Sequence, residues 1–239
     1  MRYILLISII SAVCVIPVYG QSTTSPYSLF GIGEISAGSY GENAGMGGVG
    51  IGFRQMNMLN SANPASLTTI VPQTLVFSGS FFGMYSSYWS GSMTDKKLTG
   101  NIEHLAVGVR LSPRFVASAG VVPLTSVGYT ITKDSPIEGS TQTISTRFDG
   151  SGGLSKVYLS LAWSITPRLS MGVNGAIATG RIEHTEYTEY WTIERSESVT
   201  RPYAELGLQY HNRFNDKVGY TIGIVGGLKT KLPMEGKLE

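Results

Sequence analysis

Apolar side chains occupy every second position over long stretches of this chain from Leu75 onward. In residues 104–111, for example, Leu105, Val107 and Val109 alternate with polar or small residues. Successive side chains of a β-strand point to opposite faces, so the pattern predicts strands with one apolar face. We expect an all-β antiparallel fold of about seven strands, apolar on the outer face and polar or small on the inner face.

Two kinds of connection separate the predicted strands. Short polar turns occur at 112–114, 166–168 and 215–217, and longer polar connections are expected around 91–101, 133–143 and 183–200. Short turns that alternate with long loops on long amphipathic strands are typical of an outer-membrane β-barrel. The strands, at roughly 15–20 residues, also exceed the five or six residues usual in soluble proteins. The pattern therefore predicts a transmembrane β-barrel.

Aromatic residues gather near the predicted strand ends. Those toward the long connections are Tyr85, Tyr88, Trp89, Tyr129, Tyr187, Tyr190 and Trp191, and those near the short turns are Trp163, Tyr210 and Phe214. Two aromatic belts are expected where a barrel crosses the two membrane interfaces. The aromatic positions thus favour the membrane interpretation over a soluble sandwich.

The first twenty residues have the organisation of a secretory signal. Arg2 precedes an apolar run from Ile4 to Ile16, and the following Pro-Val-Tyr-Gly ends at Gly20. We predict cleavage after Gly20 and export to the outer membrane. The apolar run is too short to span a bilayer as a helix, and no later apolar run is longer. A membrane-embedded mature chain would therefore be a barrel.

The single cysteine and the low charge exclude several functions. A lipid acceptor normally follows a small residue, but Val13 precedes Cys14, so we assign Cys14 to the signal core rather than to lipidation. The mature chain then has no thiol for disulfides, zinc–thiolate sites or nucleophilic catalysis. Charged residues make up 14% of the chain and the net charge is +2, without a clustered basic patch. We therefore expect no nucleic-acid partner.

Residues 21–72 do not follow the strand pattern and form a separate predicted segment before the strands at 73–239. Gly45, Gly47 and Gly50 formally match G-x-G-x-x-G, but no buried strand precedes them and residue 70 is Ile rather than an acid. A dinucleotide site needs both features, so we expect these glycines to allow tight backbone packing instead. Asn63-Pro64 is the expected start of a short turn or helix.

The order of these motifs resembles a known family. An Ala-Gly-Met-Gly-Gly-Val-Gly stretch at 44–50 is followed by Asn63-Pro64-Ala65, and then by Thr-Leu-Val-Phe-Ser-Gly at 74–79. Residues 120–129 are also similar to the third strand of such proteins. Over most of the mature chain, the sequence resembles the N-terminal half of FadL/TodX-like outer-membrane transporters.

The resemblance implies a 14-stranded barrel with an N-terminal hatch, here residues 21–72, that plugs the lumen. Its hatch motif would be Gly45, Gly47, Gly48, Gly50, Asn63, Pro64 and Ala65. It further implies a channel for uptake of small hydrophobic compounds such as long-chain fatty acids. An inward kink in the third strand, at Gly120, Pro123 and Ser126, would release cargo sideways. A proline-tolerant bulge without a transport role explains Pro123 equally well.

Other functions fit the same fold. A FadL-like barrel can instead serve as a protein-interaction partner of secretion machinery, as in the type IX system, or as a structural barrel without transport. In each case the chain would contact outer-membrane lipid and the barrel-assembly machinery. Seven strands are half of fourteen and would leave two unpaired edges in lipid, so we expect the chain to be the first half of a barrel.

Catalytic and metal chemistry find little support in the sequence. No Ser-centred elbow or paired Ser–His–acid motif stands out, so we expect neither an enzyme nor a cofactor. His104, His184 and His211 lie on separate predicted strands without metal-ligand spacing. The acidic residues of 183–200 are interspersed with arginines, and we interpret them as a solvated loop rather than a cation site.

Overall fold

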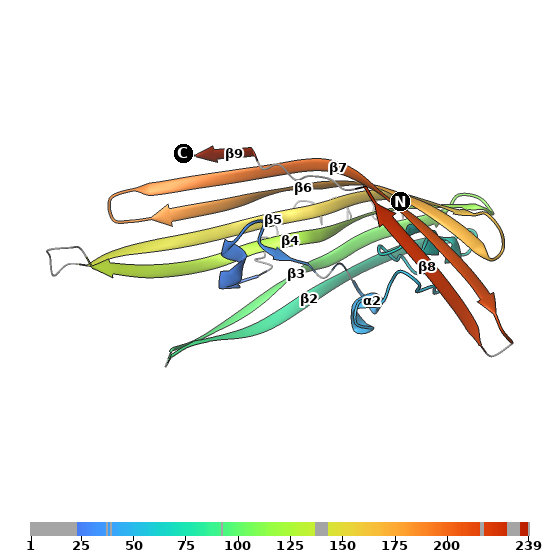
Figure 1. The fold of residues 1–239 in the computed structure, drawn as a ribbon, viewed down its shortest axis with the longest axis horizontal. Coiled ribbons are helices and arrows are strands. Elements are labelled where there is room, and N and C mark those ends of the chain that lie inside the picture. Colours follow the sequence, from blue (N-terminus) through green and yellow to red (C-terminus); the bar gives the residue numbers. More distant parts are fainter. Residues whose placement is uncertain are drawn as a thin grey trace, which may run out of the picture.

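The computed structural model describes residues 23–36, 38, 40–91, 93–136, 143–215, 218–228 and 235–238. The predicted signal at 1–20 and Cys14 lie outside these residues. Two short 3-10 helices, one short α-helix and nine strands follow one another along the described chain (Figure 1). They are η1 (Pro26–Leu29), β1 (Glu34–Ile35), α2 (Glu42–Gly45), η2 (Pro64–Thr69), β2 (Leu75–Ser90), β3 (Met93–Arg110), β4 (Phe115–Pro136), β5 (Thr143–Ser164), β6 (Leu169–Tyr187), β7 (Thr192–Arg213), β8 (Gly219–Gly227) and β9 (Glu235–Leu238).

Seven long antiparallel strands, β2 to β8, form one curled sheet in sequence order. The short strand β1 pairs with β4, and β9 pairs with β7 beyond the part of β7 that β8 covers. The all-β antiparallel prediction and its seven long strands are confirmed. Among the described residues, the helices are all too short or too polar to cross a membrane.

Two of the short turns were predicted correctly, and two of the long connections were wrong. Residues 112–114 and 166–168 join β3 to β4 and β5 to β6. Of the third turn, residues 216 and 217 lie outside the described residues. The predicted connection at 133–143 overlaps β4, which continues to Pro136, and residues 137–142 lie outside the described residues. The predicted loop at 183–200 is instead mostly strand, because β6 continues to Tyr187 and β7 begins at Thr192. The 91–101 region is strand β3 from Met93. The polar residues of 93–101 are typical of a loop, but their pairing with β2 holds them in an extended hairpin.

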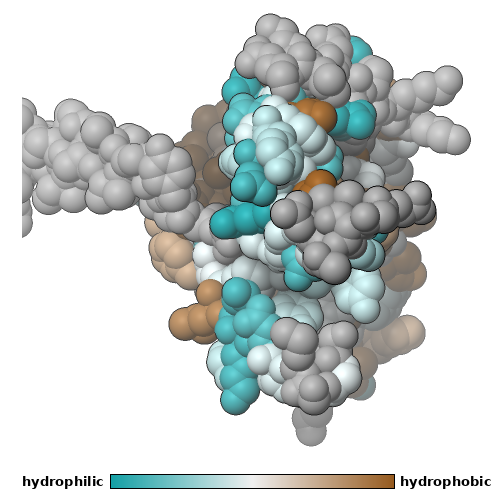
Figure 2. Space-filling view, turned by 90° about the vertical axis from the view of Figure 1, so that its left-hand side faces the viewer, coloured by the Kyte–Doolittle hydropathy of each residue, from teal (hydrophilic) through white to brown (hydrophobic). Residues whose placement is uncertain are grey.

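The two faces of the sheet differ in polarity as the alternation predicts. On β5, Val157, Leu159 and Leu161 are exposed, whereas Ser160 and Ala162 are buried. The other long strands repeat this pattern, so the outer face is apolar and the inner face is polar or small. Figure 2 views the sheet from the end where β4 turns into β5 and β6 into β7. That end is largely hydrophilic, and hydrophobic residues lie farther back along the strands.

Of the ten aromatic residues expected near the strand ends, all but Tyr88 and Tyr129 are exposed. Near the short turns, Phe115 stacks on Trp163 with ring centroids 6.0 Å apart, and Phe214 lies 4.7 Å from Tyr220. The prediction that Tyr129 belongs to the opposite belt is wrong. Tyr129 is buried on the inner face, and its hydroxyl lies 2.7 Å from His184 Nδ1. The bulge within β4 changes which side chains face inward beyond it.

Residues 23–72 pack against the inner face of the sheet. The helix η2 contacts β4, β5, β6 and β7, and η1 contacts β4. This close approach requires glycines on the strands below η2. A Cβ atom at Gly172 of β6 would overlap the backbone of Pro64, and one at Gly207 of β7 would overlap the side chain of Asn63. The inner-face glycines therefore set how closely the N-terminal segment can approach the sheet.

We predict that Gly172→Ala destabilises the protein, whereas Gly175→Ala does not. The added methyl at 172 must displace η2, and overpacking of this kind costs about 1–3 kcal/mol. Gly175 lies on the same strand but faces outward, and the nearest atom to a Cβ there is the Leu159 carbonyl oxygen at 3.9 Å. Urea unfolding of the two variants in detergent measures the difference. Equal midpoints would contradict the packing of η2 on β6.

Candidate functional site on the inner face

Asn63 anchors helix η2 to the sheet. Its side-chain oxygen accepts a hydrogen bond from the Ala65 backbone N–H at 3.0 Å, which caps the helix, and Pro64 occupies the first helical turn. Its amide nitrogen donates to the carbonyl oxygens of Ile51 at 2.8 Å and Leu208 at 3.2 Å. The side chain is fully buried. Asn63 thus joins the helix, the preceding loop and strand β7.

Two arginines hold the other end of η2. The Arg54 guanidinium donates to Thr68 Oγ1 at 2.9 Å and to Gln209 Oε1 at 3.2 Å. Arg110, on β3, donates to the backbone carbonyls of Thr68 and Ile70. Cations near the last carbonyls of a helix satisfy acceptors that have no partner within the helix. The segment is therefore fixed to the sheet at both ends of η2.

The predicted hatch-motif residues lie together in this segment. Gly45 ends α2, and Gly47 and Gly48 follow in a turn with φ of 71° and 85°, which suits glycine. The Gly50 carbonyl accepts from Asn60 Nδ2 at 2.7 Å. Ala65 is fully buried in η2. The glycine stretch and the Asn63-Pro64-Ala65 motif thus form two adjacent parts of one packed loop.

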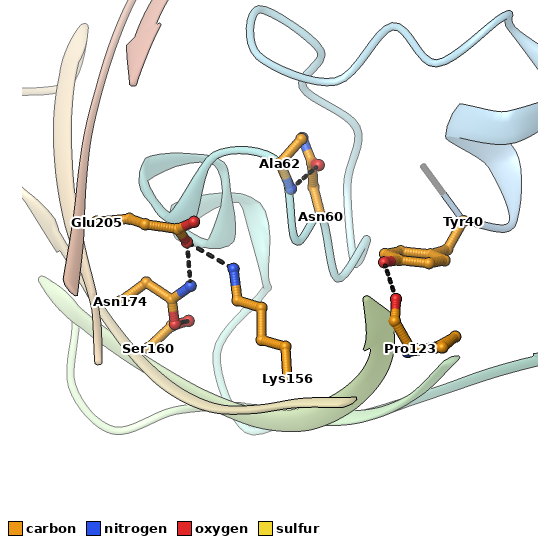
Figure 3. Close-up of polar contacts among 8 residues, drawn as sticks. All are labelled: Tyr40, Asn60, Ala62, Pro123, Lys156, Ser160, Asn174 and Glu205. Atoms are coloured by element: carbon orange, nitrogen blue, oxygen red, sulfur yellow. Dashed lines mark hydrogen bonds and ion pairs between the residues drawn. The ribbon is translucent and has the colours of Figure 1, made fainter. Parts of the chain in front are cut away.

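A buried ion pair lies on the inner face beside this loop. Lys156 Nζ is 2.6 Å from Glu205 Oε2, and Lys156 is only 7% exposed. Asn174 donates to the same carboxylate at 2.6 Å and accepts from Ser160 Oγ at 3.0 Å. Figure 3 shows the lysine and the asparagine converging on Glu205 from β5 and β6. The sheet therefore places charge in its interior and satisfies it by pairing across three strands.

A second polar cluster, which sequence reasoning missed, surrounds His104 on β2 and β3. Ser78 Oγ lies 2.8 Å from His104 Nε2, and Ser80 Oγ lies 2.9 Å from Nδ1 and donates to Glu103 at 2.6 Å. A bulge in the β2–β3 pairing brings Glu103 beside the histidine. Ser78 and Ser80 lie two residues apart on β2, so their side chains point to the same face. This spacing is the sequence signal that could have placed the two serines together. His104 itself is buried, and its ring lies 5.6 Å from that of Tyr40.

The predicted third-strand kink lies where the sheet divides. Strand β4 pairs with β5 along its whole length, with a register shift between Pro123 and Thr125, so Pro123 does mark a bulge. Strands β3 and β4 pair only from Leu105–Arg110 to Val116–Val121. Gly120 lies in this paired part, and Ser126 lies beyond it and pairs with Glu34 of β1. The three residues thus flank the point where β4 leaves β3.

Tyr40 joins the N-terminal segment to this point. Its hydroxyl donates to the Pro123 carbonyl at 3.2 Å (Figure 3). Burial raises the pKa of Tyr40 to about 12, and the negative charge of Glu103 adds to the shift. The hydroxyl therefore keeps its proton, and its hydrogen bond, well above the pH range of any cell.

His104, His184 and His211 lie on three different strands, β3, β6 and β7, of the part of the chain that the structure describes. There, no three His, Cys, Asp or Glu side chains come together in a group able to hold a metal ion.

His184 lies in a hollow of about 470 Å³ lined by both polar and apolar residues, including Leu29, Phe148 and Arg195. Arg195 is itself paired with Glu197 at 2.6 Å.

Comparison with known proteins identifies the family. The BamG family model matches residues 1–238. The chain belongs to the BamG family. Searches among curated proteins and among solved structures give no match.

Membership of the BamG family corrects the resemblance to FadL/TodX-like transporters. The predicted uptake of hydrophobic compounds such as long-chain fatty acids is therefore also wrong, and so is the predicted lateral release of such cargo at Pro123. The motifs misled because Asn63 and Pro64 serve to pack a polar segment against a curled sheet, while Gly47 and Gly48 form an exposed turn. That task is independent of what the protein binds. The alternative of a protein-interaction role is closer to the family.

We predict that Lys156→Met destabilises the protein. Loss of the lysine leaves the Glu205 carboxylate, whose side chain is 25% exposed, without its cation. The cost should exceed that of losing a surface pair and stay below the cost typical of a fully buried pair, about 3–5 kcal/mol. The matched control is Lys97→Met, which removes the exposed pair with Asp95 at 3.3 Å and should change stability by at most about 1 kcal/mol. Urea unfolding compares the two. Similar small effects would show that the inner ion pair contributes no more than a surface pair.

A second prediction concerns Tyr40. The difference between ultraviolet pH titrations of the wild-type protein and Tyr40→Phe should show one phenol ionising near pH 12. Because the folded protein holds this proton above the ordinary pKa of about 10, the contribution of Tyr40 to stability falls as the pH rises from there. A midpoint near 10 would contradict the burial of Tyr40 against β4.

Proposed function

We propose that this protein is a component of the barrel-assembly machinery and acts there by binding other proteins. The observation that carries the proposal is the BamG match over residues 1–238, since the family name associates its members with that machinery. The protein-interaction role considered from the sequence becomes the leading function. The barrel-assembly machinery is then a working partner rather than only the apparatus that inserts the chain.

An outer-membrane location fits this role. Exposed leucine, valine and isoleucine side chains cover the outer face of the long strands, and aromatic residues flank them near both ends. An apolar band between aromatic girdles is the surface that a transmembrane barrel presents to lipid. The BamG family is likewise associated with the outer membrane. We therefore propose that β2 to β8 are the wall of a membrane-embedded barrel.

The contacts of the N-terminal segment favour a scaffold role for the protein over an open channel. Asn63, Arg54 and Arg110 connect it to β3, β6 and β7 through partly buried hydrogen bonds. Such contacts hold the segment and the sheet in a fixed relation, and a fixed surface is what a protein partner requires. We propose that residues 23–72 act as a hatch that keeps the inner face closed and the barrel rigid.

The proposed role is not enzymatic. The Ser78–His104 contact has the spacing of a nucleophile and its base, but the histidine is buried. Neither Ser78 nor His104 lines the hollow beside His184, the hollow at the tip of the β2–β3 hairpin or the hollow beside Arg54. A substrate must reach a nucleophile directly, so this arrangement suits a structural cluster that joins β2 and β3 to Tyr40.

Affinity purification tests the proposal. A tagged chain, isolated in mild detergent from the outer membrane of the cell that naturally makes it, should carry the central barrel subunit of the assembly machinery in a fixed ratio. Depletion of the protein should lower the amount of folded outer-membrane barrels. A tagged outer-membrane barrel of unrelated family and equal abundance is the control. Equal recovery of the central subunit with both baits would contradict the proposal.

A further inference from the structure

The sheet opens between β3 and β4, and the described residues cover only one of the two strand edges at the opening. Beyond Leu105 and Val121 the two strands separate, and Figure 1 shows β2 and β3 diverging from β4 and β5 toward the hairpin tips. Strand β4 remains paired with β5 as far as Pro136. Strand β3 pairs, over Met93–His104, with β2 alone among the described residues. The division is internal to the sheet and independent of the ends of the chain.

The chain covers the β4 side of the opening with its own backbone. Strand β1 pairs with Thr125 and Ser126, and the Ser36 N–H donates to the Leu124 carbonyl at 2.8 Å. Farther along, the Gly128 N–H donates to Ser28 Oγ at 3.1 Å. Proteins protect a free strand edge in this way because unpaired backbone groups are costly and promote pairing with other chains. An extended segment thus fits one edge of this opening.

The β3 side has no such cover within the described residues. Its edge from Thr94 to His104 is a row of backbone donors and acceptors, for which a second extended backbone is the natural complement. Lipid provides no matching hydrogen bonds, so the edge disfavours an acyl chain as the occupant. The charges at its outer end are mixed, with Asp95 beside Lys96 and Lys97, so they select neither an acidic nor a basic ligand.

An aromatic hollow lies at the mouth of the opening. It has a volume of about 660 Å³ and is lined by Pro26 and Tyr27 from the N-terminal segment and by residues 87–89, 94 and 95 of the β2–β3 hairpin. Trp89 is 79% exposed there and Tyr27 is 80% exposed. Large exposed aromatic side chains beside a free strand edge provide a place for one apolar side chain of a paired segment.

We infer that the edge of β3 is a docking site for an extended polypeptide segment of another protein. The segment adds to β3 as a further strand and places one large apolar residue in the hollow beside Tyr27 and Trp89. Main-chain pairing supplies the binding energy and the hollow supplies selectivity. The inference concerns a backbone edge, and it holds whichever machinery the protein serves.

Disulfide capture tests this site with a defined probe. The probe is a ten-residue acetylated and amidated peptide of alternating valine and threonine, with one phenylalanine and one cysteine and with lysines at the ends for solubility. The described residues contain no cysteine, so Leu98→Cys, introduced with Cys14→Ser, provides a unique thiol. Leu98 is 80% exposed on β3, and cross-strand neighbours on one face lie at a distance that suits a disulfide.

Val107→Cys is the matched control. Val107 lies on the same strand and face, but β3 is already paired with β4 there. Mass spectrometry of the full-length chain in detergent should show the peptide adduct at residue 98 about tenfold more often than at 107, which corresponds to a preference of about 1.4 kcal/mol. In separate samples without peptide, a small maleimide should react completely with each thiol, which shows that both are accessible. Equal adducts at both positions, or none at 98, would overturn the inference.

A modified peptide and two protein variants separate strand addition from simple apolar binding. A peptide N-methylated on the amides of one edge keeps its side chains but cannot pair, and it should lose the adduct at residue 98. Retention of the adduct would mean that the hollow binds apolar groups without strand pairing, and would overturn the inference. Trp89→Ala should weaken capture about three- to tenfold, as expected for one aromatic contact. Tyr190→Ala, an exposed aromatic outside the hollow, should leave it unchanged.

Discussion

The structure depends on the satisfaction of polar groups at the inner face of the curled sheet. An apolar outer face forces every second residue of seven strands inward, and many of these residues are polar. Buried polar groups are tolerated only when they find partners. Gln209 and Asn174 find theirs across strands and in the N-terminal segment, and Lys156 pairs with Glu205. Residues 23–72 are therefore part of the interior and not an appendage of the sheet.

This requirement connects the fold to the proposed role. Asn63 and Arg54 bind the segment to β6 and β7, while Tyr40 and β1 bind it to β4. The same segment thus spans the sheet from its centre to the edge where β3 departs. A rigid interior leaves the outer surface and the opening beside β3 as the places where a partner can act. In a protein-binding member of the assembly machinery, both would be available to other chains.

The family correction shows which inferences short motifs can support. The Asn63-Pro64-Ala65 motif and the glycines at 45–50 were expected to belong together, and they do lie together. Their contacts explain why: Asn63 caps η2 and donates to the Ile51 carbonyl, Asn60 donates to the Gly50 carbonyl, and the glycines before them allow an exposed turn. A packing motif carries no information about cargo, which is why the fatty-acid function drawn from it was wrong. Pro123 is similar, since its bulge was foreseen from proline chemistry while its function was not.

The sequence alone determined the alternating strands, two of their short turns and the polarity of their two faces, but not how far β3, β6 and β7 extend. Each of these follows from local rules: alternation with a period of two, proline and polar residues in turns, and aromatic residues near strand ends. Only the tertiary structure decided the rest. The serines at 78 and 80 meet His104 through strand register, Lys156 meets Glu205 across an intervening strand, and Tyr129 faces inward because of a bulge. The division between β3 and β4 likewise depends on long-range pairing. There β4 pairs with the distant strand β1, whereas β3 pairs with β2 alone among the described residues.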